Sequence, residues 1–159
     1  TNPLRIAMEP VLVEVGAIVQ ISQQFEFGLR YAIALLKGLE NEEFSDSTFD
    51  EQFEALSKHT LGSLIKRFAK HIEIDANFSD SLSTALDARN ETVHRFFIDN
   101  IEQLASRKGR HDAIPHLKEL WKRVAAGVVA LDKVVPELMR KSGANPDEIS
   151  VAAKSAWEL

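Results

Sequence analysis

Residues 9–40 read EPVLVEVGAIVQISQQFEFGLRYAIALLKGLE, and the spacing of apolar side chains in this stretch decides the fold class. Apolar residues recur at steps of three and four positions: Leu12, Val15, Ile18, Val19, Phe25, Leu29, Ala32, Ile33 and Leu36. These steps are the period of an α-helix with one broad buried stripe. The stretch therefore predicts a long first helix, whose stripe is explained equally well by burial in a bundle or by binding to a partner.

The next third of the chain carries two further helical patterns. Phe49, Phe53 and Leu56 suggest a short helix after the polar stretch at 41–47. Thr60 is a suitable cap for a third helix that runs to Ile72, because its hydroxyl can accept a free backbone N–H. Asp75, Asn77 and Ser79 then mark a break and a new cap.

The pattern predicts a fourth helix, from Asp80 to Lys108, that is free of breaks. Arg107, Lys108 and Gly109 together are typical of a helix end, with positive charge on the last turn and glycine after it. A fifth helix is expected from a cap at Asp112 to about Lys141, with a kink or an end at Pro136.

Asn145 and Pro146 are a good start signal for a short C-terminal helix that ends near Trp157. No run of alternating residues demands a strand. The sequence predicts an all-α fold: an up-and-down bundle of four major helices with one or two short extra helices, in a single domain spanning 1–159.

Composition limits the classes of function. The 159 residues are 45% hydrophobic and include no cysteine, which excludes disulfides, thiolate nucleophiles and zinc sites that use cysteine. Nineteen Lys and Arg against 24 Asp and Glu give a net charge of −5, so any binding of nucleic acid must be local. Charged residues such as Glu14 and Arg30 interrupt the most apolar region, so no membrane span is expected and a cytoplasmic location is the default.

Polar residues intrude on the apolar stripe of the predicted fourth helix. The stripe comprises Leu82, Leu86, Val93, Phe96, Phe97 and Leu104. Arg89 and Asn100 fall in its middle, and Asn90 and His94 lie on its margin. A buried, unpaired guanidinium would cost several kcal/mol, about 3–5, so Arg89 must face a carboxylate, a polar cleft, an interface or a ligand.

Arg89 and His94 lie about 140° apart on an ideal helix, because each residue turns about 100°. A long side chain or a second copy of the helix would have to bring them together. Asn90 and His94 are four residues apart and can touch, so Asn90 could fix the tautomer of the imidazole. In the alternative, structural interpretation, Arg89 pairs with an acidic residue such as Glu26 of the first helix.

The run from Asp87 to Phe97 resembles the signature of the HEPN superfamily, in which an Arg followed by a polar residue precedes a His by four to six positions. The match is Arg-Asn-x-x-x-His, from Arg89 to His94. The resemblance implies a small helical bundle, commonly a homodimer, and in many members a metal-independent ribonuclease or toxin. It also implies an RNA substrate and a cognate antitoxin or regulatory partner.

The same resemblance implies catalytic roles for three residues and requires no metal or other cofactor. His94 would move a proton, Arg89 would hold the phosphate, and Asn90 would orient the imidazole or a phosphate oxygen. A second match, from Arg110 to His116, lacks the Asn and is set aside. The alternative function is a non-catalytic helical dimer that acts as a regulatory or protein-interaction module.

Basic and aromatic residues complete the predictions. Lys66, Arg67 and Lys70 form one basic face on the third helix and, with Arg95, are candidates for binding nucleic acid, although solvated helix surface explains them too. Phe96 and Phe97 are assigned to the core, and if only one points inward the other is a dimer contact. Trp121 and Trp157 are likewise assigned first to the core and second to an interface.

Overall fold

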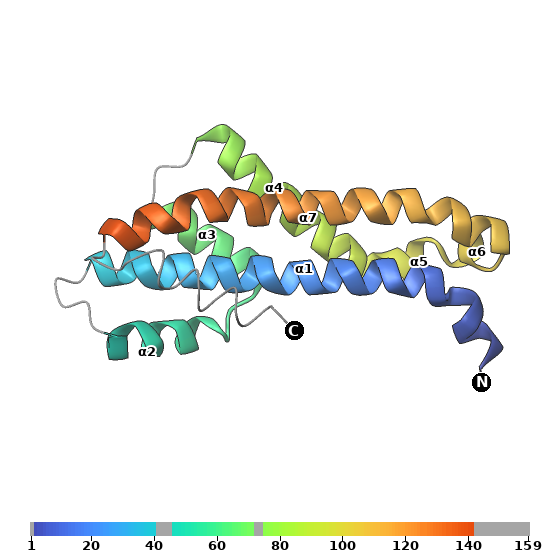
Figure 1. The fold of residues 1–159 in the computed structure, drawn as a ribbon, viewed down its shortest axis with the longest axis horizontal. Helices are drawn as coiled ribbons and strands as arrows, with labels where there is room; N and C mark the ends of the chain where they lie inside the picture. Colours follow the sequence, from blue (N-terminus) through green and yellow to red (C-terminus); the bar gives the residue numbers. More distant parts are fainter. Residues whose placement is uncertain (1, 41–45, 72–74, 142–159) are drawn as a thin grey trace. The chain divides into compact units, whose positions relative to one another are not determined.

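The computed structural model describes residues 2–40, 46–71 and 75–141 (Figure 1). No strand occurs in these three ranges, and the predicted all-α helical bundle is confirmed. In chain order the elements are α1 (Pro3–Glu40), α2 (Asp46–Leu56), α3 (Leu61–His71), α4 (Ala76–Asn90), the π-helix η1 (Glu91–Arg95), α5 (Phe96–Asp99), α6 (Ile101–Leu104) and α7 (Arg107–Lys141).

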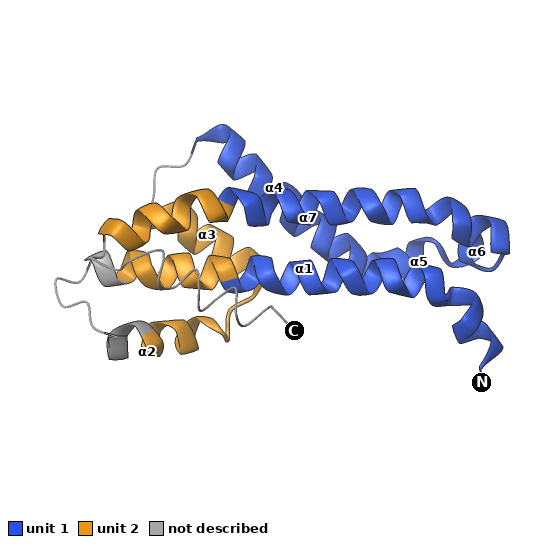
Figure 2. Ribbon diagram, viewed as in Figure 1, with its two compact units in different colours: residues 1–27, 74–130 blue, residues 28–73, 131–159 orange. Residues whose placement is uncertain are grey.

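The chain forms two compact units (Figure 2). Unit 1 comprises Thr1–Phe27 and Ile74–Ala130, and unit 2 comprises Gly28–Glu73 and Leu131–Leu159. The long helices α1 and α7 each contribute residues to both units. The assignment of residues 1–159 to a single domain stays a prediction.

Unit 1 buries apolar side chains from α1, α4, α5, α6 and α7. They are Val11, Ile18, Ile21, Phe25, Leu82, Ala85, Ala88, Phe96, Leu104, Ala113, Leu117, Leu120 and Val124. Gly127 marks a close approach, since a Cβ there would lie 2.6 Å from the Cβ of Ala85 and 2.9 Å from Cε2 of Phe25. α1, α4 and α7 therefore meet around Gly127 without room for a methyl group.

Unit 2 buries a second set of apolar side chains: Leu29, Ala32, Ile33, Ala34, Leu35, Leu36, Leu56, Leu61, Leu64, Phe68, Leu131, Leu138 and Met139. Polar contacts add to this packing between α1 and α2. The guanidinium of Arg30 lies 5.1 Å from the ring centroid of Phe53, and Lys37 Nζ donates to Gln52 Oε1 at 3.1 Å. The Arg30 guanidinium thus meets an aromatic face and the Lys37 ammonium an amide oxygen, and Nε of Arg30 is buried without a hydrogen bond among the described residues.

Two predicted helix caps are confirmed. The Asp75 carboxylate accepts the N–H of Phe78 at 2.8 Å and caps α4, and the Thr60 hydroxyl accepts the N–H of Ser63 at 3.3 Å at the start of α3. Each side chain satisfies a backbone donor that the first helical turn leaves free. α1, by contrast, starts at Pro3, earlier than the predicted Glu9.

The prediction of one unbroken helix from Asp80 to Lys108 is wrong. The chain is α-helical to Asn90, π-helical from Glu91 to Arg95, and reverses direction after Leu104. Arg107, Lys108 and Gly109 open α7 instead of ending the preceding helix.

Ser106, not Asp112, caps α7. The Ser106 hydroxyl accepts the N–H of Gly109 at 2.9 Å, and Asp112 instead accepts a bond from Lys108 Nζ at 2.5 Å. A Cβ at position 109 would lie 1.8 Å from the carbonyl oxygen of Gln103. The glycine that suggested a helix end is therefore required by the close approach of two backbones at the reversal.

Pro136 does not end α7, which continues to Lys141. A proline inside a helix removes one backbone hydrogen bond. Burial of Leu131 before it and of Leu138 and Met139 after it offsets that cost. The predicted C-terminal helix from Asn145 to Trp157, and Ile72 at the end of the predicted third helix, lie outside the described residues.

Candidate functional site

A π-helical turn, Glu91–Arg95, continues α4 in unit 1 and carries the sequence motif. The N–H of Phe96 donates to the carbonyl of Glu91, five residues earlier, in place of the usual four. The buried Thr92 hydroxyl donates to the carbonyl of Ala88 at 2.8 Å, a bond that competes with the regular helix ladder. The turn is therefore wider than an α-helical turn.

The wide turn brings Arg89 and His94 together. Nη1 of Arg89 lies 3.2 Å from Nε2 of His94, although an ideal α-helix would separate them by about 140°. Residues five apart lie nearer to one face in a π-helix than in an α-helix, because the hydrogen bonds of a π-helix join positions five apart. Contact within one chain therefore replaces the two routes that the sequence suggested, a long side chain alone or a second copy of the helix.

The tautomer of His94 follows from this contact. A guanidinium has only donors, so Nε2 of His94 accepts the bond and the proton of the neutral imidazole is on Nδ1. The His94 side chain is exposed, whereas Arg89 is half-buried. The site therefore presents an accessible proton acceptor beside a fixed positive charge.

Asn90 contacts Arg89 and not His94. Its Oδ1 accepts a bond from Nη1 of Arg89 at 3.0 Å, so the predicted bond from Asn90 to the imidazole is absent from the described part of the chain. The Asn90 amide instead positions the guanidinium of Arg89, and that guanidinium contacts His94. The structural alternative, in which Arg89 pairs with Glu26, is also not observed, and Arg89 makes no ion pair with any described residue.

The discounted second match separates into two structural roles. Nη1 of Arg110 donates to the carbonyls of Leu104 and Ala105, at 2.8 and 3.2 Å, and secures the chain reversal. His116, on α7, lies with Nε2 2.5 Å from a carboxylate oxygen of Glu91. A second histidine thus contacts the wide turn, which sequence reasoning missed because Glu91 and His116 are 25 residues apart.

An exposed apolar surface adjoins His94 in the sequence, on both sides of it. It comprises Val93, Phe97, Ile98 and Ile101, with exposed fractions of 47, 39, 74 and 70%, and we name it the α5 patch. Phe96 is buried and its ring meets that of Phe97 edge-on, with centroids 5.3 Å apart. Only one of the two phenylalanines is therefore in the core, and the prediction that Val93 lies in the buried stripe is wrong because the wide turn rotates it outward.

Asn100 and Trp121 also differ from simple core residues. Asn100 is half-buried, and its amide donates to the carbonyl of Phe96 at 2.8 Å, which explains its place on the apolar stripe. Trp121, on α7, is 38% exposed, so it is only partly in the core. Trp157 lies outside the described residues.

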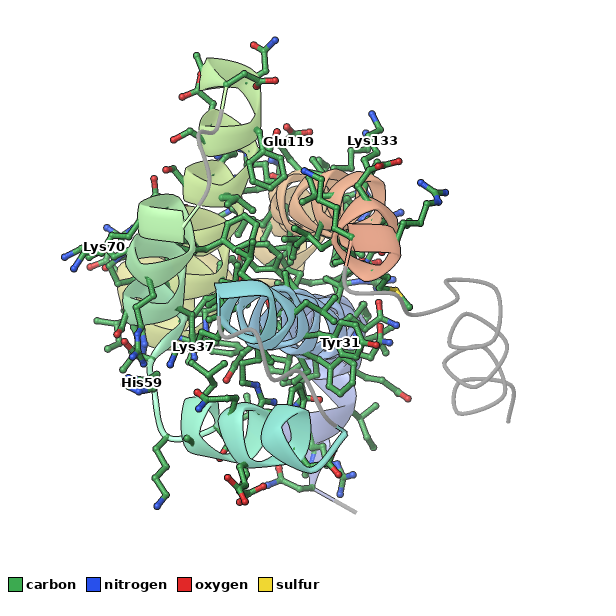
Figure 3. The ribbon with its side chains drawn as sticks, turned by 90° about the vertical axis from the view of Figure 1, so that its left-hand side faces the viewer. Tyr31, Lys37, His59, Lys70, Glu119 and Lys133 are labelled. Carbon is green, nitrogen blue, oxygen red and sulfur yellow. The ribbon has the colours of Figure 1, made fainter. Side chains whose placement is uncertain are left out.

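The predicted nucleic-acid contacts fall in different units. Lys66, Arg67 and Lys70 are on α3 in unit 2, and Arg95 is exposed on η1 in unit 1. Lys66 and Lys70 are exposed, and Figure 3 shows Lys70 directed away from α3. Arg67 is half-buried, with Nη1 2.7 Å from Nε2 of His59, so it is partly committed to a contact inside unit 2.

No cluster of three or more His, Asp or Glu side chains suited to a metal ion occurs in the described ranges 2–40, 46–71 and 75–141. Within the same ranges, no helix combines the length and the apolar character needed to cross a bilayer. At the wide turn, Arg89 and Arg95 could bind an anion, with His94 between them in sequence.

Comparisons with family models, with curated proteins and with solved structures find no match to this chain.

Proposed function

We propose that this protein is a metal-independent ribonuclease, similar to HEPN proteins, that cleaves RNA through the 2′-hydroxyl next to the scissile phosphate. The contact of Arg89 with the exposed His94 in the wide turn is the observation that supports the proposal best. It joins a phosphate-binding group and a proton acceptor without a metal ion. A role in a toxin–antitoxin or defence system, with a cognate antitoxin, rests on the resemblance of the motif alone.

The proposed reaction divides between the two side chains. His94 Nε2 accepts the proton of the 2′-hydroxyl as that oxygen forms a bond to phosphorus, and its bond to Arg89 is released at this step. The bond from phosphorus to the 5′-oxygen breaks, that oxygen takes a proton from water, and His94 then releases its proton to the resulting hydroxide. The products carry a 2′,3′-cyclic phosphate and a 5′-hydroxyl.

Arg89 stabilises the charge that develops on the phosphate. Its bonds to Asn90 and His94 both use Nη1. Among the contacts of the described residues, Nε and Nη2 are not engaged, and this edge of the guanidinium can donate two parallel bonds to phosphate oxygens. Asn90 therefore acts as a positioning residue that keeps this edge directed outward.

The test is incubation of purified protein with mixed single-stranded RNA and tRNA in excess EDTA, followed by analysis of the fragment ends. We expect cyclic phosphate ends from the wild type and a loss of about 100-fold or more in rate for Arg89→Ala and His94→Ala. His111→Ala, at an exposed position of α7, is the matched control and keeps full activity. Absence of cleavage by the wild type on every RNA would overturn the proposal.

Such an outcome would favour the second candidate function, a non-catalytic helical dimer that serves as an interaction module. The α5 patch supports it, because soluble monomers rarely expose a contiguous group of large apolar side chains without a partner. Both candidate functions involve a homodimer. The RNA cleavage assay therefore distinguishes the two functions, whereas the oligomeric state does not.

The α5 patch is self-complementary, which favours a second copy of this chain as its occupant. Val93 and Ile101, both apolar and exposed, lie four residues before and four residues after Phe97. In an antiparallel contact about Phe97, Val93 of each copy meets Ile101 of the other, as an isologous interface requires.

A charge placed in the α5 patch tests this dimer. We expect the wild type to sediment as a dimer, and Ile101→Asp to dimerise at least about tenfold more weakly because an unpaired carboxylate then enters the apolar contact. A monomeric wild type, or a variant that associates as the wild type does, would remove the α5 patch from the interface.

A further inference from the structure

Glu91 connects the wide turn to α7. Its carboxylate lies 2.5 Å from Nε2 of His116, with the Glu91 side chain 27% exposed and that of His116 46% exposed. A carboxylate is only an acceptor when ionised, so Nε2 of His116 carries the proton. The contact joins two elements of unit 1 that are far apart in the sequence.

The main chain of Glu91 takes part in the same turn. Its carbonyl accepts the N–H of Phe96, the bond that defines the π-helical turn. Its N–H donates to the carbonyls of Asp87 and Ala88. Movement of Glu91 would therefore disturb both ends of the turn that brings Arg89 to His94.

We propose that Glu91 and His116 are positioning residues, which hold the wide turn against α7 and so keep Nη1 of Arg89 in contact with Nε2 of His94. Their importance for RNA cleavage rests on the proposed function, but the positioning itself is a property of the free protein. A regular α-helical turn would separate Arg89 from His94. The bond between Glu91 and His116 of α7 opposes the change from the π-helical to the α-helical turn.

The two histidines provide a signature that a general loss of stability would not produce. His94 accepts at Nε2 and carries its proton on Nδ1, whereas His116 donates from Nε2. When both rings are neutral, these contacts favour opposite tautomers, which ¹⁵N NMR of the imidazole rings distinguishes. A change at Glu91 that alters the tautomer of His94 must act through the turn, because Glu91 has no bond to His94.

The experiment records imidazole ¹⁵N spectra of the ¹⁵N-labelled full chain, without RNA, at a pH where both rings are neutral. We expect Glu91→Ala and His116→Ala to move His94 from the Nδ1–H form to a mixture of both tautomers. Glu91→Gln keeps an oxygen acceptor for His116 and restores the wild-type His94 signals. Asp112→Ala breaks another exposed side-chain pair on α7, that with Lys108, and leaves His94 unchanged.

Two results would overturn the inference. One is a His94 spectrum that is the same in the wild type and in a folded Glu91→Ala chain, with folding checked by circular dichroism. The other is an equal change in the Asp112→Ala control. If Glu91→Ala does not fold, Glu91→Gln and His116→Gln are compared instead, and an altered His94 tautomer in Glu91→Gln would contradict the role of the acceptor.

Failure of this inference and failure of the proposed function give different results. If the wild type cleaves no RNA but the His94 tautomer changes in Glu91→Ala, the positioning role stands and the ribonuclease proposal is refuted. If the wild type cleaves RNA but the His94 tautomer is the same in Glu91→Ala, the ribonuclease proposal stands and the positioning role is refuted.

Discussion

Among the described residues, each of the two units contains one contact between an arginine and a histidine, and the local structures behind these contacts differ. In unit 1, Arg89 and His94 belong to one helical segment and meet because a π-helical turn lies between them. In unit 2, His59 lies in the turn before α3 and Arg67 on that helix, with the two nitrogens 2.7 Å apart. The same pair of residue types therefore arises from quite different spacings.

The surroundings of the two pairs also differ. His94 is exposed and adjoins the apolar α5 patch in the sequence, whereas His59 is half-buried and lies in the unit that carries the exposed Lys66 and Lys70. A guanidinium beside an imidazole is thus not by itself a site. Accessibility of the imidazole and the adjoining surface distinguish the pair of unit 1 as the candidate for chemistry.

Among the variants that distinguish the two pairs, the largest loss of stability is expected from Phe96→Ala, which removes a buried ring immediately after the wide turn. Loss of a buried phenylalanine costs about 3–5 kcal/mol of unfolding free energy. Urea unfolding followed by circular dichroism measures the loss. Phe97→Ala is the control, and its 39% exposed ring should cost no more than about 1.5 kcal/mol at concentrations where the chain is monomeric. Equal losses for the two variants would show that the core is assigned wrongly.

A smaller effect is expected from Thr92→Val, which removes the buried hydroxyl without changing the shape of the side chain much. The bond to the Ala88 carbonyl is lost, at a cost of about 1 kcal/mol. The wide turn then loses one of its supports, and Arg89 and His94 separate. We expect the ¹⁵N signals of His94 to change while those of His59 stay as in the wild type; the reverse pattern would contradict the role given to Thr92.

Thr60→Ala is expected to give the smallest effect and to act on the other pair. It removes the cap of α3, which costs about 0.5–1 kcal/mol, and it loosens the turn in which His59 contacts Arg67. The His59 signals should change and the His94 signals should not. Ser57→Ala, in the same turn but with its hydroxyl bonded back to the Glu54 carbonyl, serves as the control for a local change without loss of the cap.

The sequence predicts those parts of the fold that depend on neighbouring residues. The helix periodicity of α1 and the caps at Thr60 and Asp75 are local features, and the structure confirms the helix and both caps. Two positions of the predicted α1 stripe, Leu12 and Val19, are exposed, and Val11 and Ile21 are buried instead. The reversal before α7 is not evident from the sequence because Gly109 follows two basic residues, the usual sign of a helix end. Its true cause is the backbone of Gln103, and such a close approach has no local signal.

The candidate site was predictable in its residues but not in its geometry. Arg89, Asn90 and His94 stand out as polar intrusions on an apolar stripe. In the structure Asn90 and His94 each contact Arg89. Helix periodicity alone places Arg89 and His94 on different faces, since it assumes a regular α-helix. The wide turn depends on a buried hydroxyl and on His116 of α7, and only the folded chain brings these together.

The division of α1 and α7 between both units has a consequence for synthesis on the ribosome. Unit 1 needs Leu117, Leu120 and Val124 of α7 for its core, and unit 2 needs Leu131, Leu138 and Met139 of the same helix. Neither core can close until most of the chain has been translated, so α1 leaves the exit tunnel with its apolar stripe uncovered. During that interval the nascent chain exposes apolar side chains of α1. We expect chaperones that prevent aggregation to bind the nascent chain through these side chains.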